Sequence, residues 1–239
     1  MGRVFCTGDI HADLKSIERI KKFCINNNTT KEDLMILLGD VGANYYLDER
    51  DIKTKEALTS CPITFLCVHG NHEERPENIC GYSIINYGGA PCYFQHEYPN
   101  ILFPKDGVIN INNYRCLILG GAYSLDKKVR IARGGDWKWF SSEQMSDNTK
   151  RYINSIISKN NSFDYIFSHT SPLNYEPKYL FLSSVDQNTV DKSMEFFLQY
   201  VYDSINYEDL KKWYLGHYHS DEMLSEKIRL VFNDILELQ

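Results

Sequence analysis

Acidic residues and histidines follow a small residue at five places in the chain. The segments are GDIH (8–11), GD (39–40), GNHE (70–73), SH (168–169) and GHYH (216–219). A single histidine or a single GD pair is more often structural, but five of the seven histidines lie in these segments. Carboxylates, amides and neutral imidazoles are ligands for Mn, Fe, Zn or Mg, and no thiolate is among them. The pattern therefore predicts a metal site with oxygen and nitrogen ligands.

Each of these segments comes directly after a short apolar run that predicts a strand. The predicted strands cover residues 4–7, 34–38, 63–68, 165–167 and 213–215. The glycines allow tight turns that a Cβ would obstruct. Because sites in open α/β sheets assemble at the carboxyl ends of the strands, we expect the five segments to meet at one edge.

The remaining patterns indicate how the strands are covered and extended. Helical spacing of apolar residues predicts helices over residues 14–24, 51–60, 142–157 and 189–202. Short β-rich pieces between residues 82 and 119 predict a second, more antiparallel sheet, and residues 222–233 predict a terminal hairpin. The fold class is an α/β sandwich with helices flanking layers of sheet. With 239 residues, 43% of them hydrophobic, the chain predicts one domain over residues 1–239.

Composition limits the possible partners. Lys and Arg number 26 against 32 Asp and Glu, for a net charge of -6, so we expect no strong binding to long nucleic acids or anionic membranes. No stretch approaches the roughly 20 apolar residues of a membrane span, which favours a soluble, cytoplasmic protein. The seven cysteines include no CxxC pair. We interpret them as reduced core thiols rather than as a disulfide or zinc framework.

The ordered set DxH, GD, GNHE, H and GHxH resembles the calcineurin-like metallophosphoesterase family, and it extends from Asp9 to His219. The resemblance implies a β-sandwich of two mixed sheets flanked by helices, with a metal site at the strand carboxyl ends. It implies a phosphoesterase that hydrolyses a phosphate monoester or diester by attack of a hydroxide bridging two divalent or trivalent metal ions. Manganese is the metal expected to work in vitro, with iron, zinc or magnesium as alternatives.

The resemblance also assigns the metal ligands. The first metal would be held by Asp9, His11 and His219, the second by Asn71, His169 and His217, and both by Asp40. Two cations about 3.5–4 Å apart need such a shared carboxylate to offset their repulsion.

His72 is the catalytic residue that the resemblance implies. It would donate a proton to the leaving oxygen or stabilise the charge that develops there. In the protein-phosphatase branch, an Asp after the second motif orients this histidine and an Arg grips phosphate, but Ala43 and Asn44 occupy those places here. Without the carboxylate partner, we expect the His72 pKa near its ordinary value of about 6.5.

Two arginines are candidate substrate contacts. Arg75 matches the GNHExR form of the protein-phosphatase branch, and its alternative is a salt bridge with Glu73, Glu74 or Glu77. The stretch 120–146 resembles one in bacterial and phage members of the family, and its Arg130 is a candidate phosphate clamp. A solvated surface position is the alternative for Arg130. Glu73 is expected to anchor the backbone rather than bind metal.

Other functions remain open at this point. The chain could be a protein Ser/Thr phosphatase, a small-nucleotide or cyclic-nucleotide phosphodiesterase or nuclease, or a catalytically inactive metal-binding scaffold. The partner would then be a phosphorylated small molecule, a nucleotide or a phosphoprotein. We expect no binding to a membrane. Every ligand position holds a residue able to bind metal, which argues against the inactive scaffold.

Overall fold

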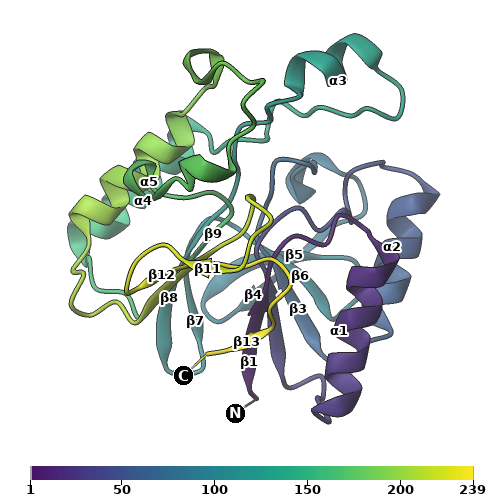
Figure 1. The fold of residues 1–239 in the computed structure, drawn as a ribbon. Coiled ribbons are helices and arrows are strands. Elements are labelled where there is room, and N and C mark those ends of the chain that lie inside the picture. Colours follow the sequence, from purple (N-terminus) through teal and green to yellow (C-terminus); the bar gives the residue numbers. More distant parts are fainter. Residues whose placement is uncertain (1, 239) are drawn as a thin grey trace.

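The computed structural model describes residues 2–238, whose strands form two sheets stacked as layers (Figure 1). The first sheet has the order β13-β1-β2-β3-β6-β5-β4. Its strands are β1 (Val4–Thr7), β2 (Leu34–Leu37), β3 (Thr64–Cys67), β4 (Ser83–Tyr87), β5 (Ala90–Phe94), β6 (Ile101–Pro104) and β13 (Leu236–Glu237). The second sheet has the order β11-β12-β10-β9-β8-β7. Its strands are β7 (Gly107–Ile111), β8 (Tyr114–Leu119), β9 (Tyr165–Ser168), β10 (Lys212–Leu215), β11 (Glu222–Met223) and β12 (Ile228–Leu230).

Parallel strands occupy the middle of each sheet, and antiparallel strands lie at the edges. The first sheet pairs β1, β2, β3 and β6 in parallel, and the second pairs β8, β9, β10 and β12. Thr7 pairs with Leu37, and Leu37 pairs with Cys67, so three strands of the first sheet end level with one another. Leu119, Ser168 and Leu215 pair likewise in the second sheet. The predicted sandwich of two mixed sheets is confirmed.

Of the helices within the described residues, four cover the outer faces of the sheets and one, α3 (Lys127–Arg133), stands away from them (Figure 1). The others are α1 (Leu14–Asn26), α2 (Glu49–Thr59), α4 (Asp147–Lys159) and α5 (Ser193–Ser204), with short 3-10 turns at Pro76–Asn78, Leu173–Tyr175, Lys178–Leu180 and Gln187–Thr189. α1 and α2 lie over the first sheet, and α4 and α5 lie over the second. A third apolar cluster fills the space between the sheets. The central strands are therefore covered on both faces, which explains their unbroken apolar sequences.

Side-chain caps fix where three of these helices begin. Asp13 accepts a hydrogen bond from the Ser16 backbone at 2.9 Å, which caps α1 two residues after His11. Asp48 caps α2 and Ser146 caps α4 in the same way. The helix expected over residues 142–157 begins only at Asp147 because Ser146 is its cap.

Parts of the expected arrangement were wrong. Residues 82–119 do not make one separate sheet, because β6 pairs in parallel with β3 and carries β4 and β5 into the first sheet. Only β7 and β8 from that region join the second sheet. The hairpin of β11 and β12 is confirmed, but β13 crosses to pair with β1 and was not expected. The short helix α3 was not expected either.

The cysteines of the described residues are all free, and all but one are buried. Cys80 is exposed and so is not a core thiol. No helix within residues 2–238 combines the length and the apolar character needed to cross a membrane.

Candidate metal centre

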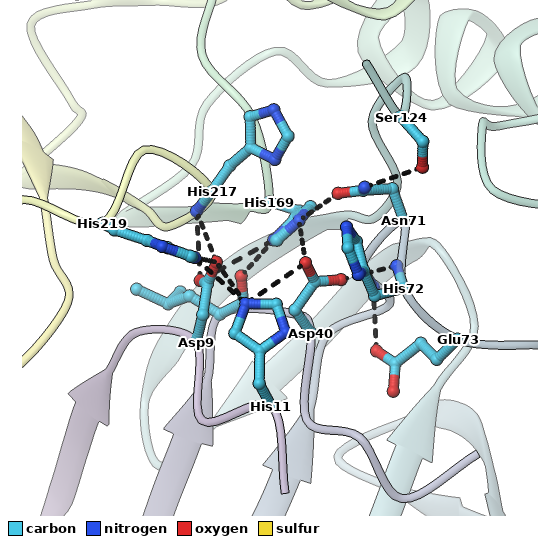
Figure 2. Close-up of polar contacts among 12 residues, drawn as sticks. Asp9, His11, Asp40, Asn71, His72, Glu73, Ser124, His169, His217 and His219 are labelled. Atoms are coloured by element: carbon cyan, nitrogen blue, oxygen red, sulfur yellow. Dashed lines mark hydrogen bonds and ion pairs between the residues drawn. The ribbon is translucent and has the colours of Figure 1, made fainter. Parts of the chain in front are cut away.

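The loops after five parallel strands bring the motif residues together in one crevice between the sheets (Figure 2). The first sheet contributes Asp9, His11, Asp40, Asn71 and His72, and the second contributes His169, His217 and His219. Three groups of side chains among the described residues are close enough to hold a metal ion: Asp9, His11 and His219; His11, Asp40 and His72; and Asp9, Asp40 and His169. Five segments that are far apart in the sequence therefore meet at one place.

Asp40 lies at the middle of the crevice. Its Oδ2 atom is 3.7 Å from His11 Nε2 and 3.5 Å from His169 Nε2. Its Oδ1 atom accepts a hydrogen bond from the His72 backbone at 2.7 Å. One carboxylate thus faces histidines from both sheets while the backbone holds its orientation.

Asp9 is the second carboxylate of the crevice. Its Oδ2 atom is 3.2 Å from His219 Nε2, and both of its oxygens accept a hydrogen bond from the His217 backbone. His11 and His219 approach each other at 3.0 Å between their Nε2 atoms. Two imidazoles and a carboxylate so placed are suited to sharing one cation.

Asn71 and His169 lie on the other side of Asp40. His169 Nδ1 is 2.7 Å from the carbonyl oxygen of Leu38, so this nitrogen carries the proton and donates it. His169 Nε2 then faces Asn71 Oδ1 at 2.9 Å. The Asn71 amide nitrogen donates to Ser124 Oγ at 2.9 Å, which turns the amide oxygen into the crevice. Sequence reasoning missed Ser124, because nothing in its local sequence marks it.

The side chain of His217 is held differently from those of the other candidate histidine ligands. Its ring packs edge-on against His169, with centroids 4.9 Å apart. Among residues 2–238, it belongs to none of the three close groups of acids and histidines. Its backbone amide, by contrast, is fixed on Asp9.

The backbone at the site is strained. Positive φ angles are found at His11 (46°), Asp40 (46°), His217 (71°) and His219 (51°), which is half of the eight non-glycine residues with this conformation in the described chain. Such angles persist where the surrounding structure imposes them, and they cluster at functional sites. Their concentration here is a second sign, independent of the residue types, that the loops serve a function.

Two glycines allow the sheets to approach each other closely at the crevice. A Cβ at Gly39, which has φ of +98°, would overlap with the His169 ring. A Cβ at Gly216 would overlap with the Asp9 carboxylate. The glycines before Asp40 and His217 are therefore needed for packing as well as for the turn.

Buried charge sets the electrostatics of the crevice. Burial alone would lower the pKa of His169, but the Asp40 and Asp9 carboxylates raise it to about 9. Burial would raise the pKa of Asp40, but His169 and the other histidines hold it well below its usual range. Burial lowers the pKa of His217 to about 3. Two buried anions facing imidazole nitrogens, with no thiolate among them, fit divalent cations of the manganese, iron, zinc and magnesium type.

His72 has a different environment from the one expected. Arg130 contacts both ring nitrogens of His72, and the Tyr45 ring stacks on the His72 ring with centroids 6.2 Å apart. Burial lowers the pKa of His72 to about 4; Arg130 also lowers it, while Asp40 opposes the shift. The expectation of a pKa near the ordinary value was wrong, because His72 is buried and the cation of Arg130 lies beside it.

The two candidate arginines lie in different places. Arg130 is only 2% exposed. Arg75 forms a salt bridge with Asp106 at 2.9 Å and donates to the Ser142 carbonyl at 3.1 Å. The alternative expected for Arg75, a salt bridge with a neighbouring glutamate, was wrong, because its acidic partner is Asp106. Glu73 instead accepts from the Gly70 backbone at 2.9 Å, which confirms its anchoring role.

A comparison with known protein families identifies the family of the chain. The profile of the family described as calcineurin-like phosphoesterase matches residues 2–221. Since the match covers most of its length, the chain belongs to the calcineurin-like phosphoesterases. It is a metal-dependent phosphoric ester hydrolase.

Three solved structures are similar to the chain at low sequence identity. One crystal structure aligns over 96% of this chain and 89% of its own, with a TM-score of 0.55 and 10% identity, and shares the fold. A phosphopantetheinyl hydrolase from Mycobacterium tuberculosis aligns over 97% and 88%, with a TM-score of 0.48 and 12% identity. A protein of unknown function from Aquifex aeolicus aligns over 71% and 81%, with a TM-score of 0.38 and 13% identity. No curated protein matches the chain significantly.

Proposed function

We propose that the chain is a dinuclear phosphoesterase that hydrolyses phosphate monoesters or diesters. The position of Asp40 is the observation that carries the proposal. It faces His11 on one side and His169 on the other, at 3.7 Å and 3.5 Å. A carboxylate with histidines on both sides can serve two cations at once, which is the arrangement that an in-line displacement at phosphorus needs.

Each cation would have its own set of residues besides Asp40. Asp9, His11 and His219 would hold the first, and Asn71, His169 and His217 would hold the second. Bound there, two divalent cations would activate a water for attack on phosphorus and neutralise charge on the phosphoryl oxygens. Manganese is the metal that we expect to support activity in vitro.

His72 and Arg130 are proposed to act on the substrate. Their contact places a guanidinium and an imidazole beside the metal ligands. The guanidinium presents several N–H donors to a phosphate oxygen. With its pKa held low, the neutral His72 ring would offer an N–H hydrogen bond to the leaving oxygen rather than a full positive charge.

A protein Ser/Thr phosphatase is less well supported. Asn44 lies inside the molecule, where its side-chain oxygen accepts a hydrogen bond from Tyr82 at 2.6 Å. Ala43 is also buried. Arg75, which matches that branch, is engaged by Asp106 and Ser142. The phosphate-binding residues of that branch are therefore missing or engaged elsewhere, and Arg130 is the cation that contacts His72.

Replacement of Asp40 by Asn tests the dinuclear proposal. The side-chain volume is kept while the shared charge is lost, so we expect nearly all turnover and about half of the bound metal to be lost. Metal content would be measured together with hydrolysis of a nitrophenyl monoester and of a bis-nitrophenyl diester, with and without added manganese. The exposed His96 provides the control, because His96→Ala should change neither quantity. Full metal content and wild-type rates in Asp40→Asn would contradict the proposal.

A further inference from the structure

A hydrogen-bonded cluster lies behind the histidines of the second sheet. Thr170 and Ser171 directly follow His169, and Tyr218 lies between His217 and His219. The Tyr218 hydroxyl is 3.0 Å from Thr170 Oγ1 and 3.1 Å from Ser171 Oγ. The loop after β9 and the loop after β10 are therefore joined by the side chains next to their histidines.

Glu195 extends this cluster to helix α5. Thr170 Oγ1 donates to Glu195 Oε1 at 2.8 Å, and Glu195 is almost fully buried. The end of strand β9 is fixed in the same region, because Ser168 Oγ accepts from Trp213 Nε1 at 2.8 Å and donates to the Thr170 carbonyl at 2.7 Å. Buried polar groups are costly unless they are hydrogen-bonded, so these hydrogen bonds favour one arrangement of the loops, although Glu195 Oε2 has no hydrogen-bond partner within the described residues.

The backbone explains why these loops need such support. His217 and His219 both have positive φ angles, and non-glycine residues keep that conformation only where their surroundings impose it. Tyr218 is the residue between them, and its ring also packs against His217 with centroids 5.0 Å apart. Tyr218 is therefore well placed to hold both flanking histidines in position.

We infer that Glu195 and Tyr218 are positioning residues of the metal centre, which set the geometry of His169, His217 and His219 by fixing the two loops that carry them. This inference rests on the proposed metal-binding role of those histidines. Residues that support metal ligands typically change metal affinity 10–100-fold when they are replaced. Because these residues act through the histidines, the effect should appear in metal binding before it appears in the chemistry.

A purely structural role is the competing explanation, because Glu195 also lies at the interface between α5 and the second sheet. Burial raises the pKa of Glu195 to about 7, so the amide of Gln is a close mimic of its carboxyl group near neutral pH. Tyr202, on the same helix, supplies the matched control. Its hydroxyl accepts a hydrogen bond from Tyr175 at 2.6 Å and is not part of the cluster that joins the two loops.

The test is calorimetric titration of metal-free protein with manganese ion. We expect Glu195→Ala and Tyr218→Phe each to raise the dissociation constant of the ion by about 10–100-fold. Glu195→Gln should restore an affinity close to that of the wild type, and Tyr202→Phe should leave it unchanged. The thermal unfolding of each metal-free variant would be recorded to confirm that it folds.

The outcomes separate this inference from the proposed function. If the wild type binds manganese and folded Glu195→Ala binds it equally well, the positioning role is overturned while the metal centre stands. An equal loss in Tyr202→Phe, or no recovery in Glu195→Gln, would also overturn it. If the wild type binds neither manganese nor another divalent ion, the metal centre itself is contradicted, and the inference with it.

Discussion

The strand-end metal centre and the segment 125–139, here called the arm, lie next to each other but are built in opposite ways. The carboxylates Asp9 and Asp40 are both 2% exposed and are held by backbone amides. The arm carries α3 and stands away from the sandwich (Figure 1). A Cβ at Gly134 or Gly135, between α3 and Trp137, would meet nothing within 4 Å, and Trp137 is 45% exposed.

One residue of the arm departs from this pattern. Arg130 is buried, donates to Asp126 and to the Lys138 carbonyl within the arm, and reaches His72 in the crevice. A further contact of the arm with the sandwich is the exposed ion pair of Arg50 and Asp136 at 2.7 Å, a type of contact that stabilises little. We therefore propose that the centre performs the hydrolysis and that Arg130 of the arm helps to bind the substrate.

Removal of a ligand imidazole should have the largest effect, because it acts on the centre itself. His11→Ala and His217→Ala should each lower turnover by at least about 100-fold, since even residues that only support ligands cost 10–100-fold in affinity or activity. Each variant should also lose metal preferentially from one of the two positions. Metal analysis and steady-state rates check this. Normal metal content in His217→Ala would show that His217 is not a metal ligand. This variant is informative because, among the described residues, His217 lies outside the three close groups of acids and histidines.

The sequence could predict the strand ends that carry the candidate ligands because their signals are local. A glycine and a polar residue directly after an apolar run mark a strand end, and the strands that carry Asp9, Asp40 and Asn71 were found within a residue or two of their bounds. Parallel pairing then places the ends of these strands level with one another. The repeated motif after each strand predicted this arrangement.

Contacts between distant side chains could not be predicted in this way. Ser124 lies 53 positions from Asn71, and Arg130 lies 58 positions from His72. Asp106, the partner of Arg75, lies 31 positions away, and no local pattern distinguishes it from the nearer glutamates. The low pKa of His72 was missed for the same reason, because it follows from burial and a cation brought in by the arm. The point in the chain where the first sheet ends and the second begins was missed, because it depends on the pairing of β6 with β3.

Replacement of His72 tests the residue through which the metal centre contacts the arm. General-acid or hydrogen-bonding help at the leaving oxygen is worth about 10²–10⁴ in rate and matters most for a basic alkoxide. His72→Ala should therefore slow hydrolysis of an alkyl phosphate much more than hydrolysis of a nitrophenyl phosphate. The ratio of the two rate losses is the measurement. Equal losses would mean that His72 stabilises phosphoryl charge or organises the metals instead.

The pH profile sharpens this test. The pKa of His72 is lowered to about 4, so its ring is neutral at any pH well above that value. Nearby metal cations would disfavour the protonated ring further. The profiles of wild type and His72→Ala should therefore have the same shape from about pH 6 to about pH 8, where an unperturbed histidine would titrate. An acidic limb near the ordinary histidine value that disappears in His72→Ala would show that the ring is protonated during turnover.

Arg130→Ala should have the smallest effect of the series, because it removes the arm's contact and leaves the metal ligands in place. A hydrogen bond to a charged group is worth about 1.5–3 kcal/mol, which corresponds to a rise in KM of about 10–100-fold if the contact is equally strong in the ground state and the transition state. A fall in kcat of similar size would mean that it tightens in the transition state. Metal content should stay at the wild-type level in either case. Arg133, on the same helix, is exposed and lies over Trp137 at 4.3 Å, so Arg133→Ala is the matched control for loss of arm charge. If both variants raise KM equally, the arm attracts the substrate by its overall charge. If Arg130→Ala instead loses metal, the contact with His72 supports the centre, and the two regions are not separate in function.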